Sequence, residues 1–136
     1  MDSQAFQKYL KQSQQLSINS PTDKKSSMDL LTLIDEHLKI CQGQEAYEYF
    51  FKGEKAFYKR QYKLSLKYYS MARKVPNFRF FCHRATANVF KNGGRIDEAI
   101  SFAWKALEMY PTDYLTLKTL ENLLQDNHKD NEAKSI

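Results

Sequence analysis

Residues that make tight turns are scarce in this chain, which has four glycines and three prolines among its 136 residues. Hairpin-rich folds need such residues at their turns, so the long stretches without them favour helices over an all-β fold. Only two cysteines are present, Cys41 and Cys82, and they form no CxxC pair. The sequence therefore predicts neither a disulfide-stapled secreted domain nor a zinc ribbon, and a reducing compartment is the simpler expectation.

Long apolar runs are absent as well. The longest, near residues 30–34 and 49–51, fall far short of the roughly 20 residues that a membrane helix needs. The first twenty residues hold Asp2, Lys8, Lys11 and many glutamines where a signal peptide would have an apolar core. With 42% hydrophobic and 27% charged residues, the chain has the composition of a folded domain. We expect a cytoplasmic protein with no membrane partner.

Acidic residues are nearly missing from the middle of the chain. Residues 52–95 contain twelve lysines and arginines and a single acid, Glu54, a formal charge of +11. Because the whole chain carries +5, the rest must sum to −6. A basic middle between acidic flanks favours an acidic partner, either an acidic peptide or nucleic acid, although solvated lysines on helix surfaces would give the same count.

Apolar residues recur at helical spacing along most of the sequence. Residues 1–26 form a polar segment and linker in which Phe6 and Leu10 mark a weak helical stripe, and Pro21 interrupts it. Leu30, Ile34 and Leu38 then predict an amphipathic helix over 28–42. Further helices are expected at 46–59, 62–74, 78–91, 96–109 and 113–126.

The second half of the chain repeats itself. When the sequence is shifted and aligned with itself so that residue 53 lies on residue 87, Gly53 pairs with Ala87, Leu66 with Ile100 and Ala72 with Ala106. Small residues therefore fall on small residues, and bulky residues on bulky ones. The stretches GEKAFYKRQYKLSLKYYSMA (53–72) and NGGRIDEAISFAWKALEMYP (92–111) resemble the tetratricopeptide (TPR) repeat, whose unit of two helices has the same length as this shift. Ser65 departs from this pattern, since the family prefers alanine there.

The resemblance implies an all-α fold, a short TPR-type array of antiparallel helix pairs forming an α–α superhelix. Its domain would span 27–136, with repeats at 46–79 and 80–113 and a partial repeat at 114–136. The helix at 28–42 would be an N-terminal extension and the last helix a C-terminal cap.

Packing within such an array makes specific demands on side chains. Small residues should lie where two helix backbones approach closely, at Gly53, Ala72, Ala87, Ala99 and Ala106. Aromatic residues, including Trp104, should fill the gaps between helices. On the last helix the expected inward residues are Leu117, Leu120 and Leu124.

No constellation in the sequence supports catalysis or a cofactor. GxSxG, HExxH, P-loop and GxGxxG motifs are all missing. His37 and Cys41 lie four residues apart, but no spacing in the chain matches a familiar zinc site. We therefore expect no enzyme, no metal site and no bound cofactor.

In TPR proteins the first helix of each unit lines a concave groove that holds a partner peptide. The resemblance therefore implies that this chain is a protein-binding adaptor or a chaperone-like module. Asparagine amides would bind the peptide backbone, and basic groups would bind carboxylates or phosphates. The resemblance places the following residues in that groove: Tyr47, Phe50, Glu54, Phe57, Phe81, Arg84, Asn88, Lys91, Lys118 and Asn122.

Two alternatives to an acidic peptide in the groove stay open. The basic segment 52–95 could bind nucleic acid, with an affinity that falls steeply with salt. The stretch from Asn77 to Pro111 also looks like the repeats of small TPR-type chaperones that serve translocator proteins of type III secretion, although those chaperones tend to be acidic.

Overall fold

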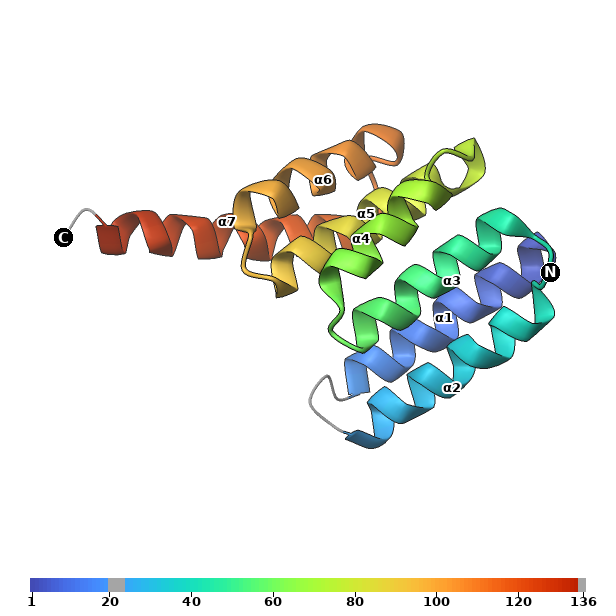
Figure 1. Ribbon diagram of the computed structural model, residues 1–136. Coiled ribbons are helices and arrows are strands. Elements are labelled where there is room, and N and C mark those ends of the chain that lie inside the picture. Colours follow the sequence, from blue (N-terminus) through green and yellow to red (C-terminus); the bar gives the residue numbers. More distant parts are fainter. Residues whose placement is uncertain (20–23, 135–136) are drawn as a thin grey trace. The chain divides into compact units, whose positions relative to one another are not determined.

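The computed structural model describes the backbone of residues 1–19 and 24–134 and the side chains of residues 1–16 and 28–128. Within these ranges the chain is all-α and contains no strand. The helices are α1 (Ser3–Asn19), α2 (Lys24–Ile40), α3 (Glu45–Tyr58), α4 (Tyr62–Ala72), α5 (Pro76–Asn92), α6 (Ile96–Met109) and α7 (Tyr114–Lys134). Antiparallel packing joins α1 to α2 and α2 to α3, and likewise α5 to α6 and α6 to α7 (Figure 1).

The bounds of α3 to α6 agree closely with the expected helices. In contrast, α2 begins before residue 28, α7 continues well beyond residue 126, and α1 was expected only as a weak helical stripe. The chain divides into two compact units, residues 1–68 and 69–136, with α4 running through the division. Residues 1–26, which the sequence assigns to a segment outside the repeat domain, contain α1, and α1 belongs to the first unit.

The core of the first unit lies among α1, α2 and α3. Ile34 of α2 and Phe50 and Phe51 of α3 are buried. Tyr9 of α1 is fully buried and packs edge-on against Phe51, with ring centroids 4.7 Å apart. Phe6, one turn earlier, is also buried. The weak stripe in the N-terminal segment is therefore the inner face of a packed helix.

Gly53 and Ser65 mark a close approach of α3 and α4. Both residues are buried, and the Ser65 hydroxyl donates a hydrogen bond of 2.8 Å to the Gly53 carbonyl oxygen. A buried hydroxyl is tolerated only when it is bonded, and a helix carbonyl supplies that bond here. This contact explains how a serine is accommodated at a close approach of two helices.

The turns after α3 and α5 have equivalent backbone hydrogen bonds. The alignment that pairs Gly53 with Ala87 also pairs the donors and acceptors of these bonds. Gln61 N–H donates to the Ala56 carbonyl and Arg95 N–H to the Phe90 carbonyl, at 2.8 and 2.9 Å. Each turn also has one residue in the left-handed region, Arg60 with φ 61° and Gly94 with φ 79°. The period that the sequence shows is thus a period of the backbone as well.

A cluster of small and leucine side chains forms the core of the second unit. It consists of Ala87, Ala99, Ala103, Leu107, Leu120 and Leu123, and Phe90, Ile96, Ile100 and Phe102 pack against it. The five small residues expected at close approaches are all buried. Trp104, however, is 51% exposed, so the expectation that it fills a gap between helices is wrong. It follows Ala103 in α6, and neighbouring residues of a helix point in different directions.

The inner face of α7 also differs from expectation. Leu120 is buried as predicted, but its companions are Thr116 and Leu123, while Leu117 and Leu124 are 43% and 45% exposed. The same shift places Thr116, Leu120 and Leu123 on Cys82, Thr86 and Val89, which are buried residues of α5. The expectation that Leu117 and Leu124 face inward is therefore wrong, because the buried positions of α7 are those that correspond to the buried positions of α5.

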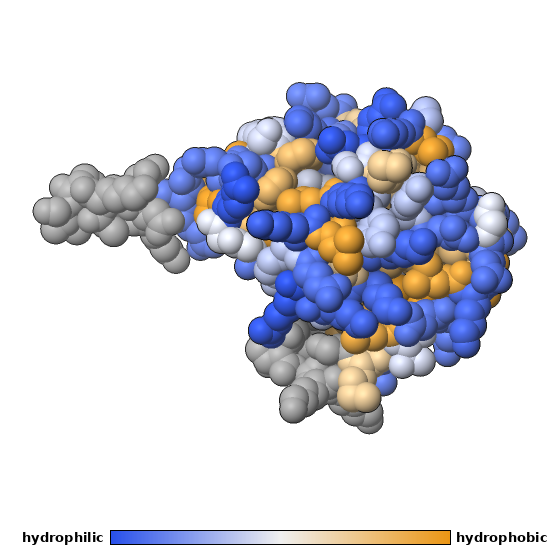
Figure 2. All heavy atoms as spheres, in the orientation of Figure 1, coloured by the Kyte–Doolittle hydropathy of each residue, from blue (hydrophilic) through white to orange (hydrophobic). Residues whose placement is uncertain are grey.

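Hydrophilic side chains cover most of the face seen in Figure 2, with hydrophobic patches between them. None of the helices that the structure describes is long and apolar enough to cross a membrane.

Candidate functional site

In the first unit, α1 covers most of the face of α3 that the TPR register assigns to the groove. The Phe6 ring lies 5.5 Å from Tyr47 and 5.2 Å from Phe50, centroid to centroid and edge-on in both cases. Phe50 is 2% exposed. Its side chain is thus committed to the core of the unit and is not open to a partner peptide, contrary to what the resemblance implies.

Glu54 is also engaged by α1. The Tyr9 hydroxyl donates a hydrogen bond of 2.9 Å to Glu54 Oε2. Burial, followed by the charge of Glu54, raises the pKa of Tyr9 well above its ordinary value, and the same two causes raise that of Tyr58. Tyr9 therefore remains a donor, and Glu54 serves the interior of the unit. Phe57, partly buried, packs edge-on against Tyr58 at 5.0 Å.

In the second unit, Arg84 already holds a carboxylate. Its Nη1 donates to both carboxylate oxygens of Asp113 at 3.3 Å. Its guanidinium also lies 5.3 Å from the ring centroid of Phe80 and 5.7 Å from that of Phe81. The Arg84 side chain is 18% exposed. The residue expected to bind a partner's acid is thus neutralised within the chain.

Asp113 has a second role as the residue before α7. Its Oδ2 accepts hydrogen bonds from the Thr116 N–H at 3.0 Å and from the Thr116 hydroxyl at 2.6 Å. A carboxylate at this position satisfies an unpaired N–H and opposes the positive end of the helix dipole. Arg84, Asp113 and Thr116 therefore form one network that joins α5 to the start of α7.

Replacing Asp113 with alanine should remove the cap and leave Arg84 without its partner, at a cost of about 1–2 kcal/mol. Asp113→Asn keeps an oxygen acceptor for the cap and loses only the charge, so it should cost less. Urea denaturation followed by circular dichroism would measure both. Equal stability of Asp113→Ala and the wild type would show that the network contributes nothing to the fold.

The other residues of the second unit that were expected to line a groove lie on α5 and α7. Asn88 and Lys91 are partly buried and follow Arg84 at intervals of four and three residues, so the three share a face of α5. On α7, Lys118 is exposed and Asn122 is partly buried, four residues apart. The structure keeps each helix's set together on one face of that helix.

A cavity lined by three lysines lies in the first unit and was not singled out from the sequence. It measures about 280 Å³. Its lining comes from the end of α2, one face of α3, the turn after α3 and the start of α4. It comprises Leu38, Lys52, Lys55, Ala56, Lys59, Gln61, Leu64 and Tyr68. The spacing of the lysines at i, i+3 and i+7 could have indicated a shared face, but the opposite wall becomes visible only in the fold.

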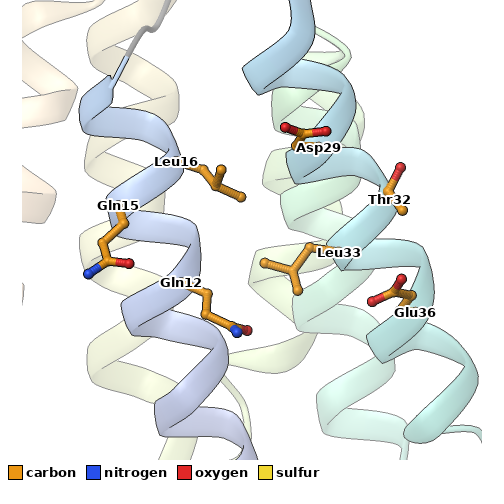
Figure 3. A pocket seen from close by; sticks show the side chains of 7 residues that line it. All are labelled: Gln12, Gln15, Leu16, Asp29, Thr32, Leu33 and Glu36. Carbon is orange, nitrogen blue, oxygen red and sulfur yellow. The ribbon is translucent and has the colours of Figure 1, made fainter.

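A second cleft of about 390 Å³ lies between α1 and α2. Leu16 of α1 and Leu33 of α2 point into it, and Asp29 and Glu36 lie along its α2 side (Figure 3). All its polar residues, which also include Gln12, Gln15 and Thr32, are exposed. Its carboxylates would suit a cation, the opposite of what the charge of residues 52–95 favours.

The histidines and cysteines do not gather. His37 Nδ1 lies 2.8 Å from the Leu33 carbonyl oxygen, and Cys41 Sγ contacts the Leu38 carbonyl oxygen. Burial raises the pKa of the Cys41 thiol. His83 has a buried Nδ1 without a hydrogen-bond partner, and burial, with Arg73 as the next cause, lowers its pKa. Among the residues whose side chains are described, no three His, Cys, Asp or Glu lie close enough to hold a metal ion.

Comparison with known proteins returned no match, whether to protein-family models, to curated proteins or to solved structures.

Proposed function

We propose that this chain is a protein-interaction module, built as a short TPR-type array, that binds an acidic segment of a partner protein. Antiparallel helix pairs, turns that recur with the period of the sequence and small residues at the close approaches support the TPR assignment. Such arrays recognise extended peptides along their helices.

The observation that carries this proposal is the unbalanced positive charge on the helix surfaces. Within residues 52–95, ion pairs join Lys55 to Asp35, Arg84 to Asp113 and Arg95 to Glu98. Most of the other nine cations of this segment are exposed. These ion pairs balance only part of the positive charge of residues 52–95. An acidic partner would complement the rest of that charge.

The residues predicted to line the groove are not equally available to a partner in the two units. On α3, the face containing Tyr47, Phe50 and Glu54 is covered by α1, so a peptide would have to bind elsewhere on the first unit. In the second unit, Asn88 and Lys91 on α5 and Lys118 and Asn122 on α7 remain candidate contacts, with Arg84 already bound to Asp113.

Peptide selection would test the proposal. The full chain is immobilised and used to select from a random dodecapeptide library displayed on phage, and we expect enrichment of sequences with several Asp or Glu. The selected peptides should bind saturably and one-to-one, with only a modest loss of affinity between 50 and 200 mM salt. The physical reason is that a short peptide forms few ion pairs and releases few counterions.

Binding of a 20-base-pair DNA duplex, measured in the same buffers, tests the competing function, which is nucleic-acid binding. If the duplex binds with an affinity that falls about a thousandfold or more over that salt range, while no acidic peptide is enriched, the basic surface serves nucleic acid and the proposal is wrong.

A further inference from the structure

We infer that the lysine-lined cavity of the first unit, named here the lysine pocket, binds a carboxylate side chain of an acidic peptide together with an apolar side chain next to it. This inference rests on the proposed function and specifies both its site and its ligand. The lysine pocket lies on α3 away from the residues that α1 covers.

The geometry of the lysine pocket follows from helix spacing. Lys52 and Lys55 lie on α3 and Lys59 directly follows its last residue, and their spacing of i, i+3 and i+7 places them along one side of the helix. Leu64 and Tyr68, at i and i+4, present one face of α4 as the opposite wall. Leu38 of α2 and Ala56 of α3 complete the apolar part of the lining. Cationic groups thus border a cavity whose other walls are largely apolar.

The three ammonium groups are not equally available. Lys55 Nζ lies 2.9 Å from Asp35 Oδ1, so its charge is already compensated at the edge of the lysine pocket. Lys52 Nζ lies 5.9 Å from the centroid of the Tyr68 ring, and both Lys52 and Lys59 are exposed. No ion pair joins either of these two lysines to any side chain that the structure describes. Two cations on one cavity are therefore left for an external anion.

Size and lining select the kind of anion. Small-molecule pockets measure roughly 300–1,000 Å³, so a cavity of about 280 Å³ accommodates one or two side chains. A nucleic acid backbone is polar throughout and would gain nothing from Leu38, Ala56 and Leu64. A peptide that carries Asp or Glu beside an apolar residue matches both parts, since the carboxylate pairs with Lys52 and Lys59 while the apolar group is removed from water.

Charge reversal in the lysine pocket provides the test. Lys52→Glu/Lys59→Glu is compared with Lys8→Glu/Lys63→Glu, which changes the charge of the same unit equally at exposed residues outside the cavity. Acidic peptides selected from the dodecapeptide library by the wild-type chain are the probes, and fluorescence anisotropy gives Kd. We expect the first variant to weaken binding at least about tenfold because attraction becomes repulsion. The second should weaken it less than about threefold, since exposed charges outside the cavity act only through a screened field.

A separate experiment tests whether the apolar part of the lysine pocket binds an apolar side chain of the peptide. Repeating the selection with Leu64→Ser should keep the preference for Asp and Glu and lose the enrichment of an apolar residue next to them. Circular dichroism should show unchanged helix content in all three variants, since the replaced side chains are exposed.

The outcomes separate this inference from the proposed function. If acidic peptides are selected but bind both charge-reversal variants equally well, the lysine pocket is not their site, while the proposed function stands. If no acidic peptides are enriched at all, the proposed function fails and the inference fails with it.

Discussion

Replacing Ala103 with arginine is expected to unfold the second unit or to destabilise it by at least about 3 kcal/mol. Ala103 is fully buried in the cluster that joins α5, α6 and α7, where Ala87, Ala99, Leu107, Leu120 and Leu123 surround it. An arginine side chain would overpack this cluster and bring a charge into a site lined by apolar side chains. Chemical denaturation followed by circular dichroism would measure the loss.

Ser101→Arg is the matched control, because Ser101 is exposed on the same helix. Its effect should stay within about 0.5 kcal/mol, as for most surface substitutions. Hydrogen exchange resolved along the chain should locate the destabilisation of Ala103→Arg in residues 69–136. If Ala103→Arg unfolds at the same denaturant concentration as Ser101→Arg, the cluster does not form the core of this unit.

The helices were predictable because the sequence repeats their pattern. The shift that brings Gly53 onto Ala87 and Ala72 onto Ala106 reflects a backbone requirement, since only small residues fit where helices approach closely. All four are buried. The helix ends were predictable for a similar reason. The same alignment places the start of α4 on the start of α6, and the turn before α4 on the turn before α6.

Contacts between distant segments were not predictable from this repetition. Arg84 and Asp113 lie 29 residues apart, and the sequence marks both as ordinary surface charges until the fold brings them together. The lysine pocket depends likewise on Leu38 and Tyr68 meeting the same face of α3. A repeat pattern indicates which face of a helix is buried. It does not indicate which charged residues meet, because those pairs depend on tertiary contacts.

The N-terminal helix was underestimated for a different reason. Its composition is polar, and few apolar residues mark its inner face. Its two aromatic residues, Phe6 and Tyr9, nevertheless make closely packed contacts with α3. Aromatic side chains bury a large area each and favour edge-on pairs, so two of them can hold a helix that its mean hydropathy would assign to solvent.

Phe6→Ala should therefore destabilise the first unit by about 3–5 kcal/mol, the usual cost of truncating a buried phenylalanine. Phe6 is 5% exposed and meets Tyr47, Phe50 and Phe51 edge-on, with centroid distances of 5.5, 5.2 and 6.1 Å. Alanine would leave a cavity against three aromatic rings and would leave Tyr9 as the main apolar anchor of α1. Chemical denaturation gives the free energy, and chain-resolved hydrogen exchange shows where protection is lost.

Gln7→Ala is the control for this change, because Gln7 is exposed and alanine is a strong helix former, so stability should hold or rise slightly. Faster exchange confined to α1 in Phe6→Ala would mean that the helix detaches while α2 and α3 stay packed. The face containing Tyr47 and Phe50 would then be uncovered, and we expect that variant to bind a hydrophobic dye that the wild type does not. Unchanged exchange in α1 would contradict the anchoring role of Phe6 and leave Tyr9, through Phe51 and its hydrogen bond to Glu54, as sufficient to hold α1 in place.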